Sequence, residues 1–121
     1  MKMKNPIGKQ GENQAAHYLM QKGYRLVEMN FKKEYTKIDI IATKDNTAVF
    51  IEVTTRVSDE PGKSFEAITH TNIGNLVRVA KVYAKMHPDL PKAIRIDAIG
   101  VTMDKNGVVE DIEHVENISK L

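Results

Sequence analysis

Residues 37–55 read KIDIIATKDNTAVFIEVTT and decide the fold. The runs 37–43 and 47–55 are rich in apolar and β-branched residues, and Lys44-Asp45-Asn46 between them is typical of a tight turn. This pattern predicts a β-hairpin. Residues 48–53 are apolar at almost every position, which favours a central strand covered on both faces.

Further elements are predicted on both sides of the hairpin. A helix is expected over 8–22, because Ala15, Ala16 and Leu19 recur on one face and Gly23 stands where a helix ends. The remaining elements are a strand over 24–32, a loop over 57–64, a helix over 69–86, a strand over 93–102 and a short strand near 112–115. The order α-β-β-β-α-β followed by a tail predicts an α/β fold, with a mixed sheet flanked by helices.

Length and composition limit the class of protein. The chain has 121 residues, which fits one domain spanning 1–121, and 18 basic against 16 acidic residues give a net charge of +2. This charge permits a nucleic-acid partner without pointing to one. Cysteine is absent, which excludes a disulfide scaffold, a thiol nucleophile and a Cys-ligated zinc site. With no membrane span and no secretory signal in the sequence, we expect a cytoplasmic protein.

Four acidic residues interrupt apolar segments: Glu12, Asp39, Glu52 and Asp97. A buried carboxylate is unfavourable unless it is paired, protonated or bound to a metal. Two unpaired carboxylates about 4 Å apart repel by about 4 kcal/mol at an effective dielectric constant of about 20. A divalent cation reverses the sign of that interaction and takes oxygen ligands, so Mg²⁺ or Mn²⁺ is a candidate cofactor.

These acids also have structural interpretations. Asp39 can pair with Lys37, two residues away on the same strand face. Glu12 can be a first-turn acid favoured by the helix dipole. For Asp97 we favour pairing with Arg95 over a metal role.

Strand alternation predicts which side chains share a face. Asp39 is expected to lie with Lys37 and Ile41, and Glu52 with Thr54. Adjacent hairpin strands can bring the two acids together, although Glu52 can equally be hydrated near a strand end. Sequence alone leaves the register open.

Several short motifs occur in an order that resembles the YraN-like uncharacterised proteins. In chain order these are Gly11-Glu12, Ala15-Ala16, Lys22-Gly23-Tyr24, Asn30-Phe31, Ile38-Asp39-Ile40-Ile41, Val49-Phe50-Ile51-Glu52-Val53 and Arg95-Ile96-Asp97. The resemblance covers roughly residues 8–101. That family is similar to the PD-(D/E)xK nucleases, whose restriction endonuclease-like fold includes Holliday junction resolvases.

The resemblance implies a function and a set of site residues. Asp39 and Glu52 correspond to the metal-binding acids, and Glu12 to an acid supplied by the first helix. In that superfamily the metal activates water for phosphodiester hydrolysis. The implied partner is nucleic acid, with DNA favoured over RNA, and a homodimer follows by analogy with the resolvases.

The sequence departs from the nuclease pattern at three places, one of which is the absence of a lysine or arginine from residues 70–75, early in the predicted second helix. The Glu-x-Lys motif is Glu52-Val53-Thr54 here, so its lysine is missing, and Gly-Glu-Ile-Asp is replaced by Thr36-Lys37-Ile38-Asp39. Lys37 or Thr54 can take over the role of the lost lysine. Alternatively, Lys37 neutralises Asp39 and displaces the metal.

Three hypotheses follow, of which the last is a structural partner domain whose acids are all satisfied by Lys37, Arg95 and Arg56. The first is a nucleic-acid-binding protein of nuclease fold with metal-dependent hydrolysis at a degraded site, in which Asp39, Glu52, Lys37 and Thr54 act. The second is a catalytically inactive module of the same fold that binds nucleic acid or a protein. The candidate nucleic-acid contacts are Arg56, Arg78 and Lys81, for which a solvated surface is the competing interpretation.

Overall fold

The computed structural model describes residues 6–58 and 72–119. Its elements in chain order are α1 (Pro6–Gln21), β1 (Arg25–Lys33), β2 (Thr36–Lys44), β3 (Thr47–Val57), α2 (Ile73–Met86), β4 (Ala93–Met103) and β5 (Val109–Val115). The five strands form one sheet in the order β1-β2-β3-β4-β5. The chain therefore has the mixed α/β architecture that the sequence predicts.

The sheet is mixed because β3 and β4 run parallel while every other neighbouring pair is antiparallel. The parallel pair extends from Thr47↔Ala93 to Val57↔Met103. A parallel pair needs a long crossover, and the connection between β3 and β4 contains α2. The predicted parallel return of the strand after the second helix is confirmed.

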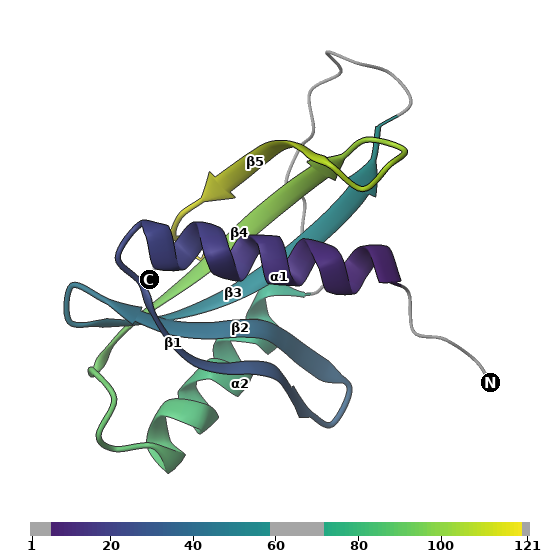
Figure 1. Ribbon diagram of the computed structural model, residues 1–121. Helices are drawn as coiled ribbons and strands as arrows, with labels where there is room; N and C mark the ends of the chain where they lie inside the picture. Colours follow the sequence, from purple (N-terminus) through teal and green to yellow (C-terminus); the bar gives the residue numbers. More distant parts are fainter. Residues whose placement is uncertain (1–5, 59–71, 120–121) are drawn as a thin grey trace.

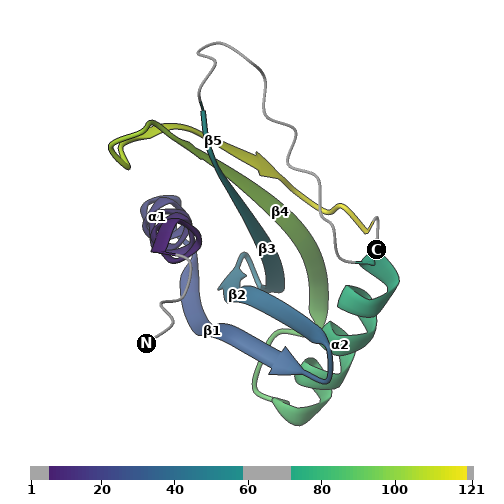
Figure 2. The same cartoon turned by 90° about the vertical axis from the view of Figure 1, so that its right-hand side faces the viewer.

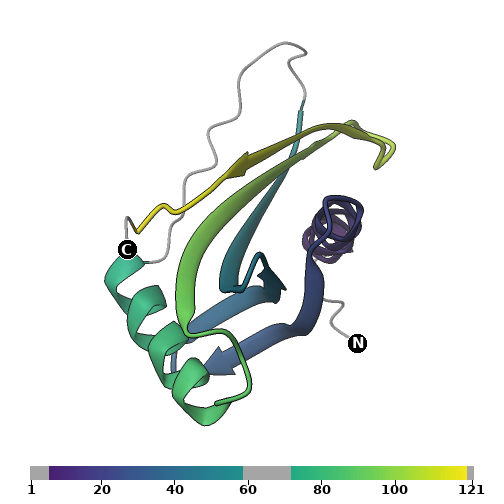
Figure 3. The ribbon, with the colours of Figure 1, turned by 90° about the vertical axis from the view of Figure 1, so that its left-hand side faces the viewer.

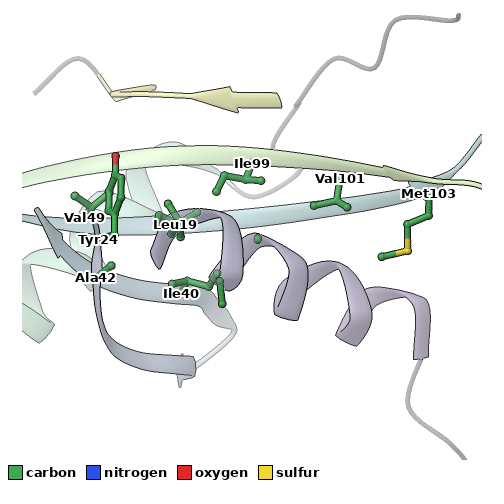
Figure 4. Close-up of a cluster of buried hydrophobic side chains, with 11 residues drawn as sticks. Leu19, Tyr24, Ile40, Ala42, Val49, Ile99, Val101 and Met103 are labelled. Carbon is green, nitrogen blue, oxygen red and sulfur yellow. The ribbon is translucent and has the colours of Figure 1, made fainter. Parts of the chain in front are cut away.

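The two helices lie on opposite faces of the sheet (Figure 1). Figures 2 and 3 show α1 end-on, with the curved sheet wrapped around it and α2 against the outer face. Each helix closes its own apolar cluster. The α1 cluster contains Leu19, Ile40, Val49, Ile51 and Ile99 among others (Figure 4).

The α2 cluster is built around Tyr83, which is 1% exposed. Its ring packs edge-on against Phe31 and Phe50, and its hydroxyl donates to Glu28 Oε1 at 2.7 Å. Burial and this hydrogen bond raise the pKa of Tyr83 to about 12. Because both faces of the sheet are covered, β3 is buried on both sides over residues 48–51, as its apolar sequence predicts.

Local turn chemistry explains where the elements end. Gly23 has φ +91° and its N–H donates to Met20 O, so the glycine ends α1 as expected. Asp45 and Asn46 have φ +49° and +58°, the left-handed pair that a two-residue hairpin turn requires. Helix α2 ends at Met86, two residues before Pro88, also as predicted.

Some bounds differ from the sequence-based expectation. Strand β5 begins at Val109 rather than near 112, because it pairs along β4 from Met103↔Val109 to Ala98↔Val115. The predicted helix residues 69–71 and most of the predicted loop 57–64 lie outside the described residues.

Candidate functional site

Asp39 lies just beyond the end of the β2–β3 pairing and between two β1–β2 pairs of one register; the β1–β2 register itself shifts between Leu26 and Glu28. The β2–β3 pairing ends at Ile40↔Ile51, and the β1–β2 pairing passes from Met29↔Ile40 to Phe31↔Ile38. Asn30, between these β1 residues, has φ +59°. At this irregularity Asp39 Oδ2 accepts a hydrogen bond from the N–H of Val53 at 2.7 Å. The carboxylate thus bonds a β3 donor just beyond the last β2–β3 pair.

The irregularity changes which residues share a face. Ile38 and Ile41 both belong to the α2 cluster, whereas Ile40 belongs to the α1 cluster. The prediction that Ile41 shares a face with Asp39 and Lys37 assumed strict alternation and is wrong. A period-2 pattern holds only along an uninterrupted strand.

Lys37 joins Asp39 to Glu12. Its Nζ lies 3.0 Å from Asp39 Oδ1 and 3.5 Å from Glu12 Oε2. The two acidic side chains are only 11% and 15% exposed, whereas that of Lys37 is 47% exposed. Partial burial alone lowers the pKa of Lys37, but hydrogen bonds and charge from Asp39 and Glu12 outweigh it and hold that pKa above its ordinary value.

Helix α1 can present Glu12 to this site because it approaches β3 closely at Gly11. A Cβ placed on Gly11 would lie 1.7 Å from Thr55 Oγ1, so any larger residue there would force the Thr55 side chain to shift. Glu12 is the seventh residue of α1, which begins at Pro6 and has no acid in its first turn. The interpretation of Glu12 as a first-turn acid is therefore wrong, and its contact with Lys37 replaces it.

As placed here, these side chains do not fit a divalent cation. The ammonium of Lys37 stands between the two carboxylates, and Asp39 already bonds Lys37 with one oxygen and Val53 with the other. Within residues 6–58 and 72–119, no group of three or more His, Cys, Asp or Glu side chains is placed to hold a metal ion. The pairing of Asp39 with Lys37 that the sequence suggested is confirmed.

Glu52 and Thr54 lie on the face of β3 that is turned away from α1 and Glu12. Ile51 packs in the α1 cluster and Phe50 in the α2 cluster, so alternation places Glu52 and Thr54 on the α2 side. Both side chains are half-buried. Their catalytic and metal-binding roles stay predictions.

The three basic candidates are spread over two elements. Arg56 is half-buried near the end of β3, where its Nε donates to Thr102 Oγ1 at 3.5 Å. Arg78 on α2 makes an exposed ion pair with Glu34 at 3.7 Å. Lys81, also on α2, lines a groove of about 560 Å³ together with Lys85, Lys92 and apolar residues after the helix. Only Arg56 belongs to the strand that bonds Asp39.

The family model that matches this sequence is that of the uncharacterised protein family UPF0102, over residues 11–101. The chain belongs to this family. It is similar to a UPF0102 protein of Syntrophomonas wolfei, with 36% identity over 115 residues that cover 95% of this chain and 98% of the relative. A UPF0102 protein of Leifsonia xyli is 41% identical over 101 residues, covering 84% and 86%. The matched region extends from Gly11 past Asp97 and includes Glu12, Lys37 and Asp39.

This UPF0102 protein has a second charged cluster, centred on Asp97, which is fully buried. Arg95 binds both carboxylate oxygens at 2.9 Å, His114 Nε2 lies 2.7 Å from Oδ2, and the N–H of Asn117 donates to Oδ1 at 2.9 Å. Burial by itself raises the pKa of Asp97, but these hydrogen bonds and the charge of Arg95 bring it below its ordinary value. The predicted Asp97–Arg95 pair is confirmed.

Sequence reasoning missed the partners that complete this cluster. Tyr18 on α1 bonds His114 Nδ1 at 3.2 Å, and Arg95 Nη2 donates to the hydroxyl of Tyr24 at 2.6 Å. Arg95 also pairs with Glu116 at 3.3 Å. The cluster links α1, β4 and β5. The only sequence signal for it is that His114 stands in a strand otherwise rich in acidic residues.

A helix able to span a membrane is absent from residues 6–58 and 72–119. Neither α1 nor α2 is long and apolar enough to cross a bilayer.

Proposed function

We propose that this protein is a nucleic-acid-binding module of the cytoplasm that holds phosphate near the carboxyl end of β3 without metal-dependent hydrolysis. The observation that carries the proposal is the meeting of Glu12 and Asp39 at one ammonium group. These are acids that the resemblance assigns to a nuclease site, and they come from α1 and β2. Their arrangement supports a nuclease-like architecture, in which the ligand is nucleic acid.

The same contact argues against hydrolysis. Metal-assisted phosphodiester cleavage needs a cation that polarises the phosphate and activates water. Here two of the three acids that the resemblance assigns to the metal, Glu12 and Asp39, bind Lys37, and position 54 carries threonine in place of the motif lysine. A threonine hydroxyl donates a hydrogen bond but supplies no charge. Binding is therefore the activity that these side chains support.

The basic group best placed for phosphate is Arg56. It lies at the carboxyl end of β3, where alternation places it with Glu52 and Thr54 on the α2 face of the sheet, opposite the face on which Lys37 meets Glu12. A guanidinium binds phosphate through two parallel N–H donors. Loss of one such phosphate contact weakens binding and reduces the slope of log K against log salt by about 1.

The test is fluorescence anisotropy with labelled single-stranded, duplex and four-way-junction DNA, and with matching RNA, in EDTA at low salt. We expect binding to DNA that falls with added salt, and intact substrates after incubation with Mg²⁺ or Mn²⁺. Arg56→Gln is expected to weaken binding and reduce the slope of log K against log salt by about 1.

Lys92→Gln is the matched control, because Lys92 precedes β4 at the opposite end of the β3–β4 pair and loses the same charge. An equal loss in both variants would show nonspecific attraction and contradict the assigned surface. Absence of binding to every probe would overturn the proposal. Metal-dependent cleavage that Asp39→Asn abolishes would establish an enzyme instead.

A further inference from the structure

The contacts of Lys37 are those expected of a bound cation. One ammonium group touches two poorly exposed carboxylates from different elements, Asp39 at 3.0 Å and Glu12 at 3.5 Å. Two such carboxylates repel each other when nothing lies between them. The ammonium removes that repulsion, so the chain supplies its own counter-charge to the pair.

Both carboxylate oxygens of Asp39 already have a partner. Oδ2 accepts the N–H of Val53 and Oδ1 faces Lys37. Mg²⁺ requires near-octahedral oxygen coordination at about 2.0–2.1 Å, usually with one or two carboxylates and several waters. A divalent ion at Glu12 and Asp39 would have to displace the ammonium or share its place against like-charge repulsion.

We infer that Lys37 is the resident cation of this site, that it excludes Mg²⁺ and Mn²⁺ from Glu12 and Asp39, and that removing its charge creates a divalent-cation site there. The inference explains how the proposed binding module keeps its acids without a metal. The inference concerns metal binding by the protein without nucleic acid. It can therefore be wrong while the protein still binds nucleic acid, and it can be right while the protein binds none.

The experiment titrates Mn²⁺ into the full chain without nucleic acid and follows free Mn²⁺ by electron paramagnetic resonance. The wild type is expected to show no saturable binding. Lys37→Gln and Lys37→Met are both expected to bind one Mn²⁺ with a Kd on the order of 10⁻³ M or tighter, a gain of about tenfold or more. Adding Glu12→Gln to Lys37→Gln should remove that gain. Circular dichroism melts confirm that each variant is folded.

Lys32→Gln is the matched control. Lys32 lies opposite Lys37 in the β1–β2 pairing, and its substitution by glutamine removes the same charge. It forms no ion pair within residues 6–58 and 72–119. Equal Mn²⁺ binding by this variant would assign the effect to net charge and overturn the inference. Folded Lys37 variants that gain nothing would also overturn it. If those variants do not fold, saturable Mn²⁺ binding by the wild type that Glu12→Gln abolishes would still contradict it.

Discussion

Among single residues, Asp97 is a buried charge on which the fold depends. Its carboxylate is fully buried and satisfied by Arg95, His114 and the N–H of Asn117. Removing one partner of a buried pair leaves the other charge uncompensated, which costs about 3–5 kcal/mol. We expect Asp97→Asn to lower the free energy of unfolding by about that amount, measured by urea denaturation at neutral pH. Asp111→Asn, an exposed change on β5, should alter it by less than about 0.5 kcal/mol.

The lowered pKa of Asp97 adds a pH dependence to this prediction. Because the folded pKa lies below the unfolded value, the contribution of Asp97 is fully present above the unfolded pKa of 3.8 and is lost as the pH falls through the folded pKa. The stability difference between wild type and Asp97→Asn should therefore narrow as the pH drops below about 4. A difference that stays constant into that range would contradict the assignment.

Between elements, the contact of α1 with β3 is decided by Gly11. Alanine there gains about 1 kcal/mol of helix propensity but must displace Thr55, whose Oγ1 would lie 1.7 Å from the new Cβ. Overpacking of this kind costs about 1–3 kcal/mol. We expect Gly11→Ala to destabilise the protein on thermal unfolding, and Asn13→Ala, an exposed change on the same helix, to be neutral or stabilising. Thr55→Ala should partly rescue Gly11→Ala; independent, additive effects would argue against the contact.

The elements that sequence predicts well are those whose ends are set locally. The glycine after α1, the left-handed pair at Asp45 and Asn46, and Pro88 after α2 act within a few residues. The irregularity at Asp39 is different, because it depends on how β2 pairs with both neighbours. The only local sequence signal for this irregularity is Asn30 on β1, because asparagine tolerates positive φ. The pairing of Asp39 with Lys37 was predictable from alternation, but the arrival of Glu12 required α1 to dock on β3.

At the scale of the whole molecule, a net charge of +2 leaves little long-range attraction for nucleic acid. Binding must then depend on a few local contacts, and Lys37 contributes little while two carboxylates neutralise it. Freeing Lys37 from one acid should make its ammonium available to phosphate. We expect Glu12→Gln to strengthen DNA binding and to steepen the slope of log K against log salt by up to about 1.

The control for this last prediction is Asp89→Asn, which raises the net charge by the same amount at an exposed position between α2 and β4. Equal strengthening in both variants would mean that overall charge, rather than Lys37, governs binding. A metal-dependent nuclease gives the opposite result, because losing Glu12 would weaken its metal and with it the bound phosphate. The test is whether Glu12→Gln raises or lowers the DNA affinity in anisotropy titrations, run in EDTA and again with Mg²⁺. A higher affinity indicates a binding module whose acids are neutralised by Lys37, and a lower affinity in Mg²⁺ indicates a metal-dependent enzyme.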